Sequence, residues 1–210
     1  LRKNICDAAV KLMKNVHYVN AGTVEFLVDQ DEKHFYFIEV NPRVQVEHTV
    51  TEMITNVDIV KSQVLIAEGY ALDGPEIAIG KQDEIWYKGV AIQCRITTED
   101  PQNNFMPDTG KIIAYRSGGG PGIRLDAGTA YTGAVITPYY DSLLVKVTAH
   151  ALHPKDTIHK MLRCMEEFRI SGVKTNIYFL QNMLRTRDFQ EGLCDVNYID
   201  RNPWLLQEPD

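Results

Sequence analysis

Two strand-like segments limit the fold of this chain more than any other feature. The runs TVEFLV, residues 23–28, and HFYFIEV, residues 34–40, are rich in β-branched and aromatic residues, and the polar sequence DQDEK separates them. This pattern predicts a β-hairpin. Positions 25 and 39 are equally distant from position 32, so a turn centred there places Glu25 directly opposite Glu39.

The predicted pairing of Glu25 with Glu39 is unfavourable unless something positive lies nearby. Side chains directly opposite each other on antiparallel strands have Cβ atoms about 4.5–5.5 Å apart, and like charges at that distance destabilise a sheet. A divalent cation would remove the repulsion, and Asn41 could add an amide oxygen to a site suited to Mg²⁺ or Mn²⁺. Such sites are completed by water and substrate phosphates, which suggests a nucleotide. On the hairpin alone, the alternative that both glutamates face water and meet lysines stays open.

The polar side chains continue beyond the second strand. In FIEVNPRVQVEHTV, residues 37–50, the even positions are apolar up to Val46, whereas five successive odd positions are polar and chemically diverse: Glu39, Asn41, Arg43, Gln45 and Glu47. Arg43 can present a planar fork to a small oxyanion, Gln45 can both donate and accept, and a carboxylate at Glu47 could take a proton. Pro42 argues against a regular central strand, so we expect the chain to leave the sheet there and curl over a site.

The rest of the chain predicts an α+β fold with a mainly antiparallel sheet flanked by helices. Helical periodicity spans residues 2–16, and Thr49 with Glu52 at capping-box spacing predicts one long helix that runs to about Ala67. From residue 88 the sequence is rich in strand-like runs, followed by helices expected over residues 154–170 and 175–189. The GGGPG sequence at 118–122 is a weak phosphate-binding signal, because Gly and Pro mark turns far more often.

Composition narrows the class of protein. The chain has 210 residues, 44% of them apolar, and a net charge of −6 without a basic cluster, so nucleic acid and anionic membranes are poor candidates as partners. No apolar run approaches the ~18 residues that a membrane span requires, and the charged, amphipathic start is unlike a signal peptide. The four cysteines form no C-x-x-C pair, which favours a reducing compartment: the cytoplasm, or the mitochondrial matrix in a eukaryote.

The motif around the second strand also carries a family resemblance. GTVEFLV together with FYFIEVNPRVQVEHTVTEM resembles the second half of the ATP-grasp module of biotin-dependent carboxylases, and the likeness continues through AIQCRITTEDP, PDTGKI, PYYDSLLVKV and GVKTNIYFLQNML. It implies the C-terminal part of an ATP-binding domain at 1–87 and a biotin carboxylase C-terminal domain at 88–207, which we expect to pack as one unit. NPRV also resembles carbamoyl phosphate synthetase, but the QVEH that follows is typical of the biotin enzymes.

The resemblance implies a reaction and a role for each polar residue. ATP phosphorylates bicarbonate to carboxyphosphate, which breaks down to CO₂ and phosphate, and biotin, carried on a separate domain, is deprotonated and captures the CO₂. Glu25 and Glu39 would hold Mg²⁺ or Mn²⁺ with Asn41 beside it, and Leu27 and Ile38 would pack near the adenine. The bicarbonate site would consist of Arg43, Gln45 and the backbone N–H of Val46, with Glu47 as base. Arg95 would stabilise the biotin enolate.

Three further positions carry weaker expectations. Asp141 in PYYDS resembles a family position near the active site and could orient Arg95, although a turn aspartate is equally consistent with the sequence. Arg124 resembles a position at the family's dimer interface, although a solvent-facing arginine would look the same. Pro42 replaces the Thr or Ser of other members, and we expect no consequence because it lies between the ligand positions.

The resemblance also defines partners and alternatives. TTEDP and NPWLLQ are most similar to members that carboxylate pyruvate to oxaloacetate, whereas members acting on acetyl- or propionyl-CoA more often read NAEDP. We expect a preceding half with a mobile lid, a biotin carrier, a carboxyltransferase domain and homo-oligomers formed through biotin carboxylase dimers. The lysines that neutralise the triphosphate have no candidate here, so the chain alone should not turn over ATP. A non-catalytic structural or oligomerisation module is the alternative from another class.

Overall fold

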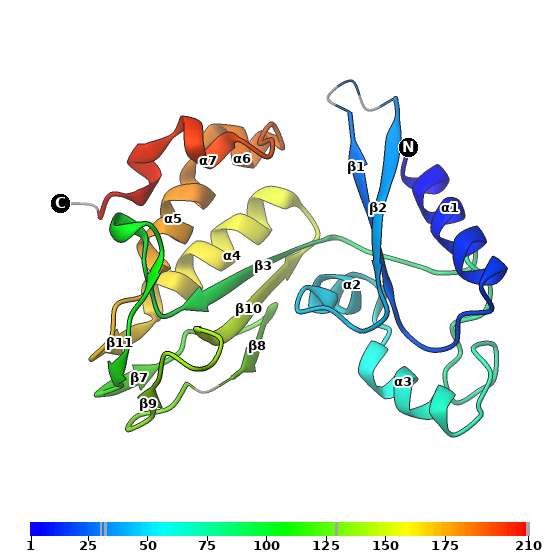
Figure 1. The fold of residues 1–210 in the computed structure, drawn as a ribbon, viewed down its shortest axis with the longest axis horizontal. Coiled ribbons are helices and arrows are strands. Elements are labelled where there is room, and N and C mark those ends of the chain that lie inside the picture. The colour runs from blue at the N-terminus through cyan, green and yellow to red at the C-terminus, as the bar shows by residue number, and fades with distance from the viewer. Residues whose placement is uncertain (30, 32, 129, 209–210) are drawn as a thin grey trace. The chain divides into compact units, whose positions relative to one another are not determined.

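A computed structural model describes residues 1–29, 31, 33–128 and 130–208. They form two compact units, Leu1–Tyr87 and Lys88–Asp210 (Figure 1). Every strand pair in the described residues is antiparallel, which confirms the expected α+β fold class. No helix among these residues is long and apolar enough to cross a membrane. The assignment of residues 1–87 and 88–207 as domains that pack as one unit stays a prediction.

The first unit is built on the predicted hairpin. Strand β1 pairs with β2 over the two segments expected from the sequence, and β2 ends where Pro42 follows it. Its elements are α1 (Arg2–Asn15), β1 (Thr23–Val28), β2 (Phe35–Asn41), α2 (His48–Thr55) and α3 (Ile59–Ala67). The predicted departure of the chain from the sheet at Pro42 is therefore confirmed.

The single long helix expected from Thr49 to about Ala67 is wrong. Helix α2 ends at Thr55, and its C-cap Asn56 has a left-handed backbone with φ 58°. The Asp58 carboxylate starts α3 by accepting the Lys61 N–H at 2.8 Å. Thr49 is a buried residue inside α2 and does not cap it. Asn tolerates the left-handed conformation and Asp is a good N-cap, so local chemistry overrides the apolar periodicity here.

The second unit has a three-stranded sheet in the order β3-β10-β8 with helix α4 packed on its apolar face (Figure 1). Fully buried side chains from both layers, including Ile96, Val147 and Met161, form the core. The strands are β3 (Val90–Thr97), β4 (Glu99–Asp100), β5 (Met106–Pro107), β6 (Gly110–Lys111), β7 (Ala114–Arg116), β8 (Ile123–Ala127), β9 (Val135–Ile136), β10 (Leu143–Ala151) and β11 (Arg169–Ser171). The helices are α4 (Pro154–Glu167), α5 (Ile177–Arg185), α6 (Arg187–Glu191) and α7 (Tyr198–Arg201).

Two helix predictions in this unit were too long. The helix expected over 154–170 stops at Glu167, and the chain continues as strand β11, which pairs with β7. The helix expected over 175–189 is interrupted at Thr186, whose hydroxyl accepts the Phe189 N–H at 3.2 Å and starts α6. A threonine that can cap a new helix ends the old one, because its side chain competes for backbone groups.

The glycine-rich sequence at 118–122 serves close packing. A Cβ on Gly118 would lie 2.5 Å from the carbonyl oxygen of Cys164 in α4. Gly122 has a φ of 80°, and a Cβ there would lie 2.5 Å from the His150 carbonyl oxygen. Only glycine fits both positions, so the approach of this loop to helix α4 and strand β10 explains the glycines.

Candidate active site

The hairpin places Glu25 and Glu39 directly opposite each other, as the sequence predicts. The register shifts immediately afterwards, so that Phe26 pairs with Phe37 and Ile38 is the extra residue of a bulge. Bulges re-aim side chains at functional sites. This bulge separates the paired carboxylates from the aromatic end of the hairpin, where Phe26 makes edge contacts with Phe35 and Phe37.

Two side-chain amides lie against the paired carboxylates. Asn41 donates from Nδ2 to Glu25 Oε1 at 2.8 Å and to Glu39 Oε1 at 3.1 Å. Gln45 donates from Nε2 to the same oxygen of Glu25 at 2.8 Å. The amide hydrogens supply the partial positive charge that the two carboxylates require. A turn of the Asn41 amide would present its oxygen instead, and the set would then be two carboxylates and an amide oxygen, which fits Mg²⁺ or Mn²⁺.

After Pro42 the chain makes a tight turn that exposes Arg43. The Arg43 N–H donates to the Asn41 carbonyl at 2.7 Å, across Pro42. The guanidinium donates from Nη1 to the Val44 carbonyl at 3.2 Å, and the side chain is exposed. An exposed guanidinium two residues after Asn41 can bind a small anion such as bicarbonate.

Glu47 stands at the start of helix α2 as its N-cap residue, and its side chain makes no capping hydrogen bond. The turn before the helix is closed by the His48 N–H, which donates to the Gln45 carbonyl at 3.3 Å. Gln45, Val46 and Glu47 are therefore consecutive residues of one hydrogen-bonded turn. The turn brings an amide, a backbone N–H and a carboxylate close to Arg43 along the chain.

A contact between His48 and Glu52, which the sequence analysis did not predict, supports this turn. The Nδ1 of His48 lies 2.7 Å from the Gln45 carbonyl oxygen, and its Nε2 lies 3.8 Å from Glu52 Oε2. Glu52, only 7% exposed, also accepts the Ile59 N–H at 2.7 Å at the start of α3. The spacing of His48 and Glu52, four residues apart on one helix face, was the available signal.

The two residues expected to pack near adenine lie on the same hairpin. Leu27 is 50% exposed and Ile38 is 54% exposed. These half-exposed aliphatic side chains lie on the strands that carry the glutamates. They offer an apolar surface to a flat ring, because covering apolar surface and removing it from water is favourable. Their contact with a nucleotide stays a prediction.

Arg95 belongs to the second unit, on the exposed face of strand β3. Its neighbours Cys94 and Ile96 are 5% and 0% exposed, and burial raises the pKa of the Cys94 thiol to about 12. Across the strand pair Arg95 is opposite Lys146 of β10. The alternation of the strand therefore directs the guanidinium away from the apolar core.

Asp141 and Arg124 have local partners in the second unit. Asp141 accepts the Leu143 N–H at 2.8 Å, the bond expected of a turn aspartate at the start of β10. Arg124 makes a bidentate pair with Asp126, from Nε and Nη2, both at 2.8 Å. Support of the active site by Asp141 and a dimer contact by Arg124 stay predictions.

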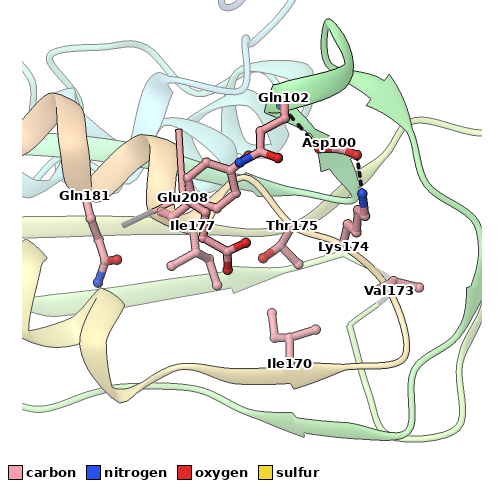
Figure 2. Close-up of a pocket in the computed structure, with 10 residues that line it drawn as sticks. Asp100, Gln102, Ile170, Val173, Lys174, Thr175, Ile177, Gln181 and Glu208 are labelled. Atoms are coloured by element: carbon pink, nitrogen blue, oxygen red, sulfur yellow. Dashed lines mark hydrogen bonds and ion pairs between the residues drawn. The ribbon is translucent and has the colours of Figure 1, made fainter. Parts of the chain in front are cut away.

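A cavity of about 330 Å³ lies in the second unit at the start of helix α5. Figure 2 shows Lys174 paired with Asp100 at its edge, with Thr175 and Ile177 on either side of the helix start. Hydrogen bonding to the Lys174 ammonium holds the pKa of the Asp100 carboxyl below its usual value. The ion pair therefore fixes the segment that leads into α5.

Comparison with known proteins identifies the family. Residues 93–201 match the family described as the biotin carboxylase C-terminal domain, and residues 1–74 match the carbamoyl-phosphate synthase L chain, ATP binding domain. The first match covers more than half of the chain, so the chain belongs to the biotin carboxylase family.

Among its relatives are pyruvate carboxylases. The pyruvate carboxylase of Bacillus subtilis (strain 168) is 60% identical over 209 residues, which are 100% of this chain and 18% of that protein. A solved structure of Rhizobium etli pyruvate carboxylase with the allosteric activator acetyl coenzyme-A has a TM-score of 0.95 and 50% identity, covering 100% of this chain and 21% of that one. The biotin carboxylase domain of Hydrogenobacter thermophilus 2-oxoglutarate carboxylase, solved with MgADP, ADP and bicarbonate, has a TM-score of 0.93 and 40% identity, covering 100% of this chain and 44% of that one.

These comparisons confirm the family resemblance seen in the sequence. The chain spans 18% of the length of the Bacillus subtilis relative.

Proposed function

We propose that the enzyme containing this chain carboxylates biotin with bicarbonate and ATP, as the biotin carboxylase component of a pyruvate carboxylase. The observation that carries the proposal is the pairing of Glu25 with Glu39, joined by Asn41 and followed directly by the turn that bears Arg43, Gln45 and Glu47. A structural module would have no need for two opposed carboxylates at this cost in repulsion.

Glu25, Glu39 and Asn41 would hold Mg²⁺ or Mn²⁺ through oxygen atoms. A divalent ion supplies charge neutralisation to the ATP phosphates during phosphoryl transfer. The amide of Asn41 contacts both carboxylates, which supports its inclusion in the same site after a turn of the amide. Glu25 and Glu39 would thereby also orient the nucleotide, with Leu27 and Ile38 against the adenine.

The turn beyond Pro42 would bind and activate bicarbonate. Arg43 would bind the anion with its guanidinium, and Gln45 and the Val46 N–H would donate to its oxygens. Glu47 would accept the bicarbonate proton while a bicarbonate oxygen attacks the γ-phosphorus of ATP, forming carboxyphosphate and releasing ADP. Gln45 donates a hydrogen bond to Glu25, so this contact would connect the bicarbonate site to the metal site.

Arg95 would serve the second half-reaction. Its guanidinium would stabilise the negative charge that develops on biotin before it takes up CO₂, which is an electrostatic role for a preset cation. The exposed position of Arg95 on β3 supports this assignment because a carrier-bound group must reach it from solvent.

The relatives support a choice of acceptor and of partners. The 60% identity to a pyruvate carboxylase favours carboxylation of pyruvate to oxaloacetate over an acyl-CoA acceptor. The full-length enzyme would add the preceding half with its lid, a biotin carrier and a carboxyltransferase domain. We further propose homo-oligomers through biotin carboxylase dimers, and a cytoplasmic or mitochondrial matrix location.

The test is Glu47→Gln in the full-length enzyme. Gln keeps the shape of the side chain but cannot take a proton, so bicarbonate-dependent ATP cleavage should fall by about 100- to 10,000-fold. Binding of ATP, followed by isothermal titration calorimetry, should be unchanged. Full activity in this variant would refute the assignment of Glu47 as base.

A further inference from the structure

Asn176, at the N-cap position of α5, holds the backbone of strand β3 at Arg95. Its Nδ2 donates to the Arg95 carbonyl oxygen at 3.0 Å, and its Oδ1 accepts the Thr97 N–H at 3.0 Å. The Asn176 N–H also donates to the Thr97 carbonyl at 3.3 Å. One residue thus makes three hydrogen bonds to the strand segment that bears Arg95.

The side-chain amide of Asn176 bonds to a backbone carbonyl and a backbone N–H of β3, as a neighbouring strand would. Strand β3 pairs with β10, and Asn176 bonds to Arg95 and Thr97 in addition to that pairing. A carbonyl can only accept and an N–H can only donate, so these two partners fix which end of the amide is oxygen and which is nitrogen. Asn176 is 6% exposed, and a buried amide with both ends bonded strongly prefers one orientation.

The segment that carries Asn176 is itself anchored. The Lys174 N–H donates to Asp108 Oδ2 at 2.6 Å, and the Lys174 ammonium pairs with Asp100. Figure 2 shows this pair beside Thr175 and Ile177, the residues on either side of Asn176. The side-chain amide of Asn176 therefore bonds to β3 from a backbone segment that is itself held by hydrogen bonds.

We propose that Asn176 is a positioning residue for Arg95. This rests on the proposed role of Arg95 in carboxylation of biotin. Because the side chain of Arg95 extends from the backbone unit that Asn176 binds, loss of the amide lets the end of β3 shift and displaces the guanidinium. Misplacement of a catalytic group by about 1 Å can lower a rate by about 100-fold.

The experiment compares two activities of the full-length enzyme. Asn176→Ala should lower carboxylation of free biotin by about 10- to 100-fold, whereas bicarbonate-dependent ATP cleavage, which depends on Glu47 and Arg43, should change by less than about twofold. A fall of both activities together, or of neither, would overturn the proposal. If the unsubstituted enzyme itself fails to carboxylate biotin, the proposed function fails instead.

A matched control lies on the same helix. Asn182 donates from Nδ2 to the carbonyls of Leu205 and Gln207, at 3.0 and 2.9 Å, so Asn182→Ala removes two similar bonds away from β3. It should leave the ratio of the two activities unchanged. If Asn176→Ala does not yield folded enzyme, Asn176→Asp keeps the volume and the Thr97 bond but places an oxygen against the Arg95 carbonyl, and the same selective loss is expected.

A double substitution separates positioning from general structure. In an Arg95→Ala background, Asn176→Ala should lower residual biotin carboxylation by less than about twofold, because residues that act as a unit are not additive. The same 10- to 100-fold loss in both backgrounds would show that Asn176 acts independently of Arg95 and would overturn the proposal.

Discussion

The opposed carboxylates Glu25 and Glu39 are stabilised by the side-chain amides of their neighbours. Glu25 accepts from two amides, Asn41 and Gln45, and Asn41 contacts Glu39 as well, so the opposed carboxylates are bridged by neutral donors. A buried or half-buried carboxylate pair without such donors would be costly. The amide donors therefore stabilise the paired carboxylates, and a metal ion would take over this role after a turn of the Asn41 amide.

The ion pair of Asp100 and Lys174 makes the second unit sensitive to acid. The hydrogen bond from Lys174 lowers the pKa of Asp100, so its contribution to stability is present above the unfolded pKa of about 3.9 and is lost as pH falls through the lower folded pKa. The same bond raises the pKa of Lys174, whose contribution is lost at high pH. Asp100→Asn should lower the unfolding temperature at pH 7, and its difference from the unsubstituted chain should shrink below about pH 4.

Thermal unfolding followed by circular dichroism across this pH range measures the effect. Asp200→Asn, which replaces an exposed aspartate in α7, is the control and should show no comparable difference. A difference for Asp100→Asn that stays constant from pH 7 to strongly acid conditions would contradict the account.

At the scale of elements, strand pairing was predictable and helix interruption was not. The hairpin register follows from two runs at equal distance from one turn, and its result, Glu25 opposite Glu39, is confirmed. The helix expected over 49–67 breaks at Asn56, which adopts the left-handed backbone conformation, and the helix expected over 175–189 breaks at Thr186, whose hydroxyl accepts a backbone N–H. Such breaks depend on helix-capping residues, and the periodicity of apolar residues carries no information about them.

Asn56 provides the test at this scale. Its φ of 58° is favourable for Asn and Gly and unfavourable for a β-branched residue. Asn56→Val should destabilise the first unit by about 1–2 kcal/mol, whereas Asn56→Gly should change stability by only a few tenths. Urea unfolding of both variants distinguishes them, and equal loss in the two would mean that the side chain of Asn56 matters more than its backbone conformation.

At the scale of the whole molecule, the candidate site was predicted as a row along one stretch of sequence, but its supports were not. Asn176 bonds to the Arg95 carbonyl oxygen although 81 residues separate the two. Glu52 accepts a backbone N–H at the start of α3, a helix that was not predicted as a separate element. Contacts between distant segments leave no periodic signal in one sequence. The family motif identified the residues that were given chemical tasks, and the structure adds the residues that hold them in place.

In the proposed function, Glu25, Glu39 and Asn41 would hold a divalent ion against the nucleotide phosphates, so metal binding is best measured with a nucleotide present. The most direct measurement is therefore Mn²⁺ affinity of the full-length enzyme with bound ADP, followed by electron paramagnetic resonance. Glu39→Gln should weaken Mn²⁺ binding by at least about tenfold, whereas Glu47→Gln should leave it unchanged. Equal affinities in all three proteins would contradict the division of metal and proton tasks along this row.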